Sequence, residues 1–357
     1  MKKLFKSKTF KNNLITYGMV IAAYVVVQIL TATGNISSLM KGLLVPLCVY
    51  AILAVSLNLT VGILGELSLG HAGFMCVGAF TSAFFSKIMQ NSGMPAGLRF
   101  FIAILIGAAC AGIFGILIGI PVLRLKGDYL AIVTLAFGEI IKNLINILYI
   151  GIDENGMHIS FTNTMDLNLT DTGTVIIKGA QGITGTPNDS NFTIGIILLL
   201  ITLFIVLNLI HSRDGRAIMA IRDNTIAAES VGIHITKYKL MAFSISAALA
   251  GVAGVLYGHN LSSLTATPKN FGYNMSIMIL VFVVLGGIGN IRGSVIAAVV
   301  LTLLPELLRG LNDYRMLIYA IVLIIMMLFN WAPKCIEWRE KLLYKLKRNR
   351  KTTKEAE

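Results

Sequence analysis

Apolar runs of about 20 residues recur along almost the whole chain and constrain its fold more than any other feature. As an α-helix, a run of that length crosses about 30 Å of hydrocarbon, the thickness of a bilayer core. The 357 residues are 56% hydrophobic and 13% charged, which is little charge for the surface of a soluble protein. Because the runs do not alternate every second residue, a membrane β-barrel is not expected. The sequence therefore predicts an all-α polytopic membrane protein.

The apolar runs predict ten transmembrane helices, an even number that places both termini on one side. The expected spans are 14–33, 40–61, 70–90, 100–122, 129–150, 192–211, 239–260, 274–289, 294–309 and 315–331. Eight spans are the alternative, if 70–90 or 274–289 does not cross fully. The membrane domain then covers 14–331, between a basic N-terminus (1–13) and a basic tail (332–357) that is expected to lie on the anionic inner leaflet.

The distribution of charge predicts the orientation. A net charge of +13 could suggest a nucleic-acid partner, but the Lys and Arg residues gather at the two ends and in short loops. This is the positive-inside pattern, so both termini and the basic loop 212–238 are expected in the cytoplasm, as are Arg124, Lys126 and Arg292. Segment 151–191 carries five acidic residues and one lysine and is expected outside. No nucleic-acid partner is predicted.

No motif in the sequence predicts an enzyme. The chain contains no GxxxxGK[ST], HExxH or GxSxG sequence, and its four cysteines form no CxxC pair. We therefore expect no catalytic residue, no metal site and no cofactor bound by this chain.

Two glycine-broken stretches are candidates for a translocation pathway. Residues 58–80 combine several glycines with polar side chains that include Glu66, Ser68 and His71, and residues 285–293 are rich in glycine. Non-helical backbone at membrane depth is tolerated only where it is buried or lines a cavity, and interrupted segments in both halves of a transporter indicate its pathway. Helix packing alone is the alternative. The candidate pathway residues are Gly65, Glu66, Ser68, Gly70, His71, Glu139, Gly286 and Gly287.

The charged candidates in this set need a partner or water. Glu139 and Lys142 are three residues apart in an expected helix, so they can pair on one face. A structural ion pair and a pathway-lining role both remain open for them. Because a carboxylate at membrane depth is costly unless it is paired or hydrated, Glu66 is expected near water or a partner.

The loop 212–238 is a polar, basic island between two apolar runs. Asn224 can cap a short helix over 225–231, and Gly232 can end it. Arg216 and Arg222 precede this helix. Its composition alone is equally consistent with a solvated connector and with a docking site for a soluble partner.

Three long motifs resemble the LivM-like permeases of the branched-chain amino acid ABC importer family. They are SLGHAGF (68–74), RLKGDYLAIVTLAFGEII (124–141) and GRAIMAIRDNTIAAESVGI (215–233). The stretches AALAGVAG (247–254) and GGIGN (286–290) fit as well, and the resemblance extends from about residue 40 to 331. Position 66 departs from the family, which more often has an uncharged residue there. The pattern is also similar to that of urea ABC permeases.

The resemblance implies a permease subunit that imports Leu, Ile or Val across the bacterial cytoplasmic membrane. Its implied partners are a LivH-like second permease, two ABC ATPase subunits that bind ATP and Mg, and an extracytoplasmic substrate-binding protein. The loop at 215–233 becomes the segment that couples to the ATPase, through Arg216, Arg222, Asp223, Ala227, Ala228, Glu229 and Gly232. Alternatives are a permease for urea or another small solute, and a stand-alone ion-coupled transporter that uses Glu66 or the Glu139–Lys142 pair.

Overall fold

The computed structural model describes residues 8–34, 37–91, 93–125, 127–154, 156–170, 173–308 and 314–331. The expected tail at 332–357, Lys126 and the first seven residues of the expected basic N-terminus lie outside these described residues. The chain divides into two compact units, Met1–Ala298 and Val299–Glu357. The fold is mostly helical, as the sequence predicts.

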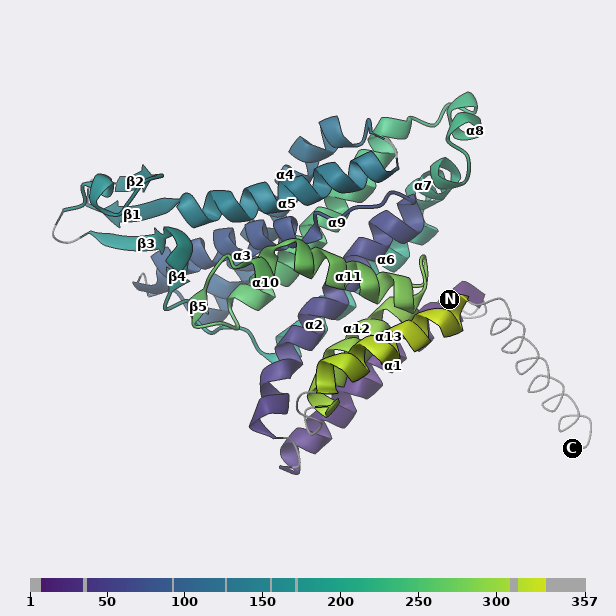
Figure 1. The fold of residues 1–357 in the computed structure, drawn as a ribbon, viewed down its shortest axis with the longest axis horizontal. Helices are drawn as coiled ribbons and strands as arrows, with labels where there is room; N and C mark the ends of the chain where they lie inside the picture. The colour runs from purple at the N-terminus through teal and green to yellow at the C-terminus, as the bar shows by residue number, and fades with distance from the viewer. Residues whose placement is uncertain are drawn as a thin grey trace, which may run out of the picture. The chain divides into compact units, whose positions relative to one another are not determined.

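Each range that was expected to span the membrane contains one of the longer helices (Figure 1). The first unit contains α1 (Lys8–Ala32), α2 (Ser38–Asn58), α3 (His71–Ile88), α4 (Ala96–Val122), α5 (Asp128–Ile147), α6 (Phe192–His211), α7 (Arg213–Asp223), α8 (Thr225–Ser230), α9 (Ile235–Gly258), α10 (Pro268–Phe271) and α11 (Tyr273–Gly286). Helix α12 (Ile291–Leu307) begins in the first unit and ends in the second, which also contains α13 (Arg315–Trp331).

Seven helical segments of the described chain are long and apolar enough to cross a membrane, fewer than the ten spans expected. Helices α12 and α13 have 17 residues each, which is short for a full crossing. The third expected span that is missing from the seven corresponds to α3, which carries glycines, hydroxyl side chains, His71 and Lys87. It packs against α4, α5 and α9, and its first ten residues are all buried. Because protein surrounds α3, it does not need the strongly apolar surface of a lipid-facing helix.

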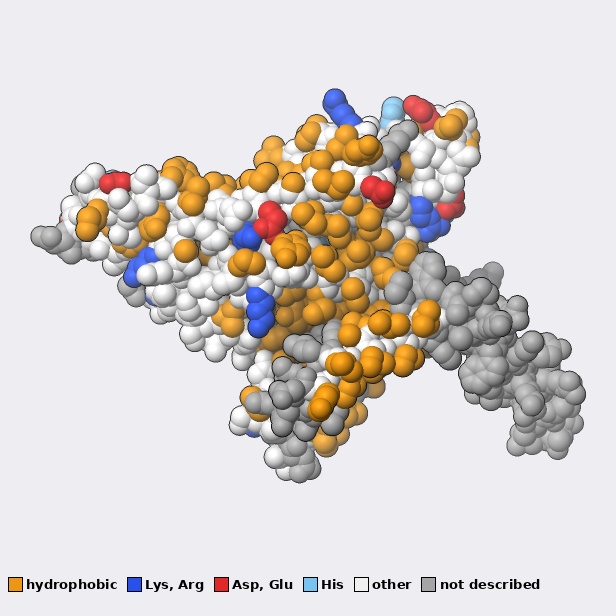
Figure 2. Space-filling model, in the orientation of Figure 1, with side chains coloured by type: hydrophobic (Ala, Val, Ile, Leu, Met, Phe, Trp, Pro, Cys, Tyr) orange, Lys and Arg blue, Asp and Glu red, His pale blue; other side chains and the backbone are white. Residues whose placement is uncertain are grey.

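Apolar side chains cover the helix faces that point away from the core. Helices α1, α4, α5 and α6 each expose several large aliphatic or aromatic residues, and Figure 2 shows the visible face of the helices covered largely by hydrophobic side chains. In water such a surface would drive aggregation, whereas in a bilayer it is the surface expected to face lipid. The exposed apolar faces confirm the prediction of a membrane protein.

Helices α3, α4 and α9 approach one another closely through small residues. In α4, Gly107, Ala111, Gly115 and Gly119 recur every fourth residue and form one face, which packs on α9. A Cβ atom added to Gly251 of α9 would lie 2.4 Å from Ala111 Cβ and 2.8 Å from the Gly107 carbonyl oxygen. Close backbone contact through small residues is a common way for membrane helices to associate, because apolar side chains gain little by leaving lipid.

This packing predicts that Gly251→Ala destabilises the protein by about 1–3 kcal/mol, because the added methyl group has no space. The matched control is Gly97→Ala in α4, where an added Cβ would meet no atom within 4 Å. The thermal unfolding midpoint in detergent should fall for the first variant and stay constant or rise for the second. Equal midpoints in the two variants would contradict this account of the α4–α9 contact.

The expected loop 151–191 contains a small β-structure that the sequence analysis did not predict. Strands β1 (Tyr149–Asp153), β2 (Gly156–Ser160) and β3 (Thr174–Lys178) form an antiparallel sheet in the order β2-β1-β3. Strand β4 (Ile183–Thr184) pairs with β5 (Ser263–Leu264), which follows α9. The fifth expected span is consequently shorter than predicted: α5 ends at Ile147, and residues 149 and 150 belong to β1.

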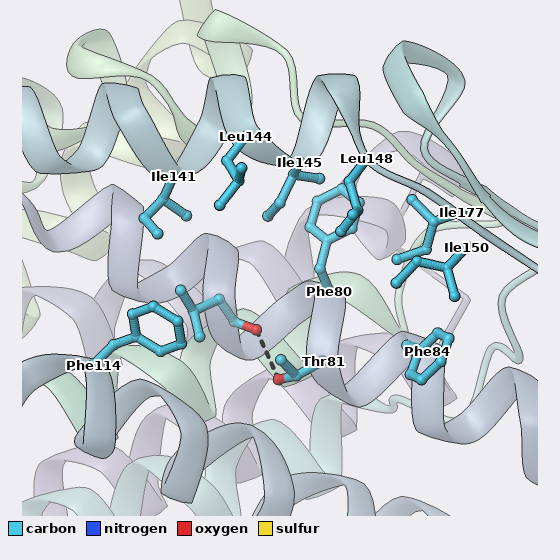
Figure 3. Close-up of a pocket in the computed structure, with 11 residues that line it drawn as sticks. Phe80, Thr81, Phe84, Phe114, Ile141, Leu144, Ile145, Leu148, Ile150 and Ile177 are labelled. Carbon is cyan, nitrogen blue, oxygen red and sulfur yellow. Dashed lines mark hydrogen bonds between the residues drawn. The ribbon is translucent and has the colours of Figure 1, made fainter. Parts of the chain in front are cut away.

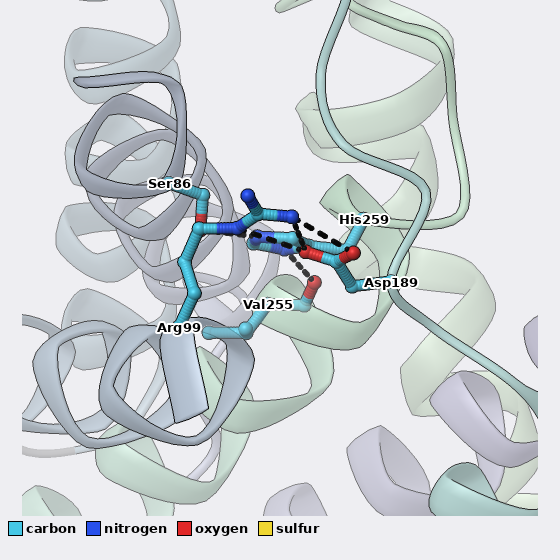
Figure 4. A network of polar contacts seen from close by, with 5 residues as sticks. All are labelled: Ser86, Arg99, Asp189, Val255 and His259. Atoms are coloured by element: carbon cyan, nitrogen blue, oxygen red, sulfur yellow. Dashed lines mark hydrogen bonds and ion pairs between the residues drawn. The ribbon is translucent and has the colours of Figure 1, made fainter. Parts of the chain in front are cut away.

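A buried polar network attaches the end of this segment to the helices (Figure 4). Arg99 of α4 donates to both carboxylate oxygens of Asp189, at 2.7–3.2 Å, and 9% and 13% of the two side chains are exposed. Beside them, His259 Nδ1 lies 2.9 Å from the Val255 carbonyl oxygen and Nε2 lies 2.8 Å from Ser86 Oγ.

The β-strands and this network lie at one end of α3, α4, α5 and α9, and α7 and α8 lie at the opposite end (Figure 1). The location of 151–191 and 212–238 on opposite sides of the membrane stays a prediction.

Candidate coupling and pathway site

Helices α7 and α8 are short helices with well-formed caps. Ser212 Oγ accepts from Gly215 N at 3.0 Å at the start of α7. Asn224 Oδ1 accepts from Ala227 N at 3.0 Å at the start of α8, as the sequence predicts. Gly232 has φ +84°, the left-handed conformation that favours glycine after a helix. Only the last residue differs, because α8 ends at Ser230 rather than at 231.

Helix α8 presents an exposed apolar surface with one carboxylate. Ile226 and Val231 are 81% and 74% exposed, and Glu229 is exposed between them in sequence, whereas Ala228 is buried against the protein. Exposed aliphatic side chains on a polar, capped helix at the end of a membrane domain are typical of a protein-docking surface.

Arg216 and Arg222, which both precede α8, make different contacts. Arg216 is exposed and donates to the His211 carbonyl oxygen at 3.2 Å. Arg222 points back to the membrane domain: its Nη1 donates to the Gly62 carbonyl oxygen at 3.0 Å. Its Nε and Nη2 donate to Asp223 Oδ1 at 3.0 and 2.8 Å. The guanidinium group therefore connects the loop at 212–238 directly to the first glycine-broken stretch.

That stretch is broken in the structure as well. After α2 the backbone forms a π-helical turn, Leu59–Leu64, and then reverses at Gly65, which has φ +80°. A Cβ atom at Gly65 would lie 2.5 Å from Arg222 Cγ, so the contact between loop and break requires glycine. Residues 65–70 form no helix, and α3 begins at His71.

Neighbouring helices hold the non-helical segment in place. Leu69 N donates to Thr134 Oγ1 of α5 at 3.0 Å, and Glu66 N donates to the Thr60 carbonyl oxygen at 3.1 Å. Gly70 lies against α5 so closely that a Cβ atom would be 2.5 Å from the Thr134 carbonyl oxygen. These contacts hold the irregular backbone in place, with Ser68 and Gly70 buried and Gly65 exposed, and such backbone is tolerated at membrane depth where it is packed in protein or lines a cavity.

Glu66 has a partner that the sequence analysis did not identify. Its carboxylate pairs with Lys239 near the start of α9, and 14% and 11% of the two side chains are exposed. The pair joins the break to the helix that directly follows the loop at 212–238. The carboxylate is therefore compensated by a lysine 173 residues away in the chain.

We expect Glu66→Gln to retain transport with an unchanged pH profile and to cost about 1–2 kcal/mol of stability. The reason is that the amide oxygen can still accept a hydrogen bond from Lys239, whereas the ionic part of the interaction is lost. Uptake measured between about pH 5.5 and 8, on either side of neutrality, checks this. Loss of the pH dependence in the variant would instead indicate that Glu66 carries a proton during transport.

Ser68 and His71 are buried with unused hydrogen-bonding capacity. Ser246 Oγ donates to the Ser56 carbonyl oxygen at 2.5 Å, so it accepts from His71 Nε2 at 2.9 Å and leaves Nδ1 as an acceptor. Within the described part of the chain, His71 Nδ1, Ser68 Oγ and Thr60 Oγ1 have no hydrogen-bond partner. Buried polar atoms are usually satisfied, so three such atoms along one break call for an explanation.

Glu139 occupies a structural position. It pairs with Lys142 of the same helix, as the spacing predicts, and its Oε1 accepts from Tyr273 N at 2.7 Å. Tyr273 is the first residue of α11, so Glu139 satisfies one of the unpaired N–H groups at that helix end. These contacts support the structural alternative for the ion pair.

Asn58, which the sequence analysis did not select, joins the two glycine-broken stretches. Its Oδ1 accepts from Gly289 N at 2.8 Å, and its Nδ2 donates to Ser294 Oγ at 2.7 Å. A Cβ atom at Gly62 would lie 2.4 Å from Gly289 N. A single asparagine inside an otherwise apolar run was the available signal, since such residues are rare in membrane spans and usually functional or paired.

The second stretch is a tight turn between α11 and α12 rather than an interruption within one helix. A Cβ atom at Gly286 would lie 2.3 Å from Ser294 N, and Gly287 has φ +93°. These two glycines are explained by close helix approach and by the turn itself. The structure therefore brings Gly65, Glu66 and Arg222 together, whereas Glu139 and Gly286 make their contacts elsewhere.

An apolar cavity of about 220 Å³ lies among α3, α4, α5, β1 and β3 (Figure 3). Among the described residues that line it, the one polar side chain is Thr81, which donates its hydroxyl hydrogen to the Val77 carbonyl oxygen at 2.7 Å. The cavity could take an aliphatic group but offers nothing to an ammonium or a carboxylate. It is therefore not a complete site for an amino acid, which needs polar anchors.

Comparison with known proteins identifies the family to which this chain belongs. The family described as "Branched-chain amino acid transport system / permease component" matches residues 39–328, and the chain belongs to this family. It is therefore a multi-pass transport permease, as the sequence motifs indicate.

Several curated proteins are similar over most of the chain. The high-affinity branched-chain amino acid transport system permease protein LivM of Salmonella typhimurium is 35% identical over 295 residues, covering 80% of this chain and 67% of that protein. LivM of Escherichia coli K12 is 35% identical with the same coverage. LivH of Escherichia coli K12 is 23% identical, covering 78% of this chain and 88% of LivH. No solved structure matches the chain.

Proposed function

We propose that this chain is the membrane subunit through which Leu, Ile and Val enter the cell in an ATP-driven importer. The observation that carries the proposal is the hydrogen bond from Arg222 to Gly62, because it joins α7, the helix directly before the exposed docking helix α8, to a broken membrane helix. The similarity to LivM proteins supports the choice of substrate. ATP and Mg would be bound by separate ATPase subunits, and this chain would act as a gated passage without a catalytic residue.

The proposed coupling begins at α8. An ATPase subunit would receive Ile226, Val231 and Glu229, and closure of the ATPase dimer would displace α7 and α8 together. Arg222 would transmit the displacement to Gly62 and Gly65, where the backbone is least regular. Arg216, Asp223, Ala227, Ala228 and Gly232 belong to the same coupling segment.

The proposed pathway follows the first break. Ser68, His71 and Gly70 would face the passage during part of the cycle, since unpartnered buried polar atoms can bind the polar groups of an amino acid. Gly287 would belong to the pathway only through its neighbour Gly289, which contacts Gly62. Alternating access then arises as the break opens and closes against the sister permease.

The proposed assembly contains a LivH-like second permease, two ABC ATPases and an extracytoplasmic substrate-binding protein, with no nucleic acid. It would lie in the bacterial inner membrane with both termini and the segment at 212–238 in the cytoplasm. The segment at 151–191 would be extracytoplasmic, where the binding protein docks. The basic residues of α7 and the acidic residues of 151–191 support this orientation.

Uptake of labelled leucine at sub-micromolar concentration, in cells with and without the gene, tests the proposal. Labelled urea is measured in parallel. We expect leucine uptake to fall and urea uptake to remain in cells without the gene. Loss of urea uptake alone would leave the permease architecture standing and overturn the substrate.

A further inference from the structure

A second, polar cavity of about 450 Å³ lies where α1, α6, the π-helical turn and the α11–α12 turn meet. Its polar lining consists of Asn13, Thr16, His211, Asn290 and Arg292. The rest of its wall is aliphatic apart from Gly289, and every lining residue belongs to the first unit. The cavity is separate from the exposed surface of α8 and from the apolar cavity of Figure 3.

The charges of the residues that line the cavity favour an anion as its ligand. It contains an arginine and a histidine, and none of the described residues that line it is Asp or Glu. Arg292 Nε donates to Thr16 Oγ1 at 2.5 Å, which fixes the guanidinium group at the wall. His211 Nδ1 donates to the Leu207 carbonyl oxygen at 2.6 Å, so that Nε2 is the ring nitrogen left for other contacts. A guanidinium group held in this way suits a phosphate, with which it forms strong charge-assisted hydrogen bonds.

Among phosphate-bearing molecules, the apolar surface next to the cavity favours a lipid. Leu14 and Ile15, next to Asn13 and Thr16 on α1, are exposed apolar residues on a membrane helix. The outer faces of α1 beside the cavity are therefore apolar and can contact the acyl chains of a lipid whose headgroup lies in the cavity. Basic pockets between membrane helices on the cytoplasmic side are a common setting for anionic lipid headgroups.

We propose that this cavity binds the phosphate of an anionic phospholipid. The lipid would lie in the inner leaflet if the orientation given under the proposed function holds; binding itself does not depend on that function. Because Ile63 and Gly289 also line the cavity, the lipid would contact both glycine-broken stretches near their meeting point. It would thereby stabilise the contact between the π-helical turn and the α11–α12 turn.

Titration of the purified full-length chain in a neutral detergent tests this proposal, with dioctanoyl phosphatidylglycerol against dioctanoyl phosphatidylcholine. We expect the anionic lipid to bind at least about tenfold more tightly, since one charge-assisted contact is worth about that factor. Arg292→Gln should reduce binding of the anionic lipid by about tenfold for the same reason. Equal affinity for the two lipids, or unchanged binding in the variant, would overturn the proposal.

Two further variants separate the site from the fold and from general surface charge. Asn290→Asp introduces a negative charge into the cavity and keeps the oxygen that accepts from Gly293 N at 3.3 Å, so it should weaken binding even if Arg292→Gln does not fold. Arg213→Gln removes an exposed arginine outside the cavity and should leave the affinity unchanged. Weakening by Arg213→Gln equal to that by Asn290→Asp would overturn the site.

Competition identifies the source of the phosphate and the class of ligand. Inorganic phosphate should displace the lipid only weakly, because it lacks the acyl chains. Displacement by inorganic phosphate at the affinity of the lipid would indicate a free-anion site, and displacement by leucine would indicate part of the substrate passage; either result would overturn the lipid assignment. None of these binding measurements requires transport, so their failure is distinguishable from a failure of the proposed function.

Discussion

Glu229→Arg is expected to abolish transport while the chain remains inserted and abundant in the membrane. Glu229 is exposed on α8 and forms part of the surface proposed to dock with the ATPase. Reversal of its charge should break that interface without removing any contact within the membrane domain. Uptake of labelled leucine and the amount of the chain in the membrane fraction, measured in the same cells, check the prediction.

Asp214→Arg is the matched control, because it reverses an exposed carboxylate on α7, outside the docking surface of α8. It should retain transport, with a small cost from placing a positive charge in the first turn of a helix. Normal uptake in the Glu229→Arg variant would remove the basis for assigning α8 as the coupling helix. An equal loss of uptake in both variants would mean that the effect comes from the net charge at this end of the protein and not from the docking surface of α8.

Asp189→Ala is expected to destabilise the protein by about 3–5 kcal/mol, because it leaves the buried Arg99 guanidinium without its counter-charge. The change should also release the end of the segment at 151–191 from α4. The thermal unfolding midpoint in detergent measures the loss of stability, and protease cleavage within 151–191 measures the release.

The double variant Arg99→Met with Asp189→Leu is the control for this ion pair. Since replacing both charges with apolar groups removes the unpaired charge, the double variant should be more stable than Asp189→Ala alone. If the single variant unfolds at the wild-type temperature, the Arg99–Asp189 pair does not hold this segment in place.

The features that depend on local sequence were predictable. Long apolar runs predict the positions of the longer helices, since crossing hydrocarbon demands both length and hydrophobicity. The start and end of α8 follow from Asn224 and Gly232, because capping requires these residue types at these positions. The Glu139–Lys142 pair follows from helical spacing.

Contacts between distant parts of the chain were not predictable from local pattern. The partner of Glu66 is Lys239, and Asn58 contacts Gly289 and Ser294, more than 170 residues away in each case. Periodicity and capping describe neighbours within a turn or two, so they contain no information about these pairings. The same limit applies to Arg222, whose place in the loop was predicted but whose bond to Gly62 was not.

The small sheet was missed for a different reason. The segments Tyr149–Asp153 and Gly156–Ser160 have only five residues each, mix apolar and polar side chains, and follow a membrane helix. The period-two pattern of these segments is weak beside the apolar run before them, so the sequence predicts a helix that continues to residue 150. The Asn155-Gly156 pair where the chain passes from one strand to the next is nevertheless typical of a hairpin sequence.

The most direct test of the account is leucine uptake into proteoliposomes that contain this chain, its LivH-like partner, the ATPase subunits and the binding protein. We predict uptake that requires ATP on the side of α8, persists when a protonophore collapses the proton gradient, and is lost when Glu229→Arg replaces the wild-type chain. Uptake by this chain alone, driven by a proton gradient without ATP, would contradict the account and identify a stand-alone transporter.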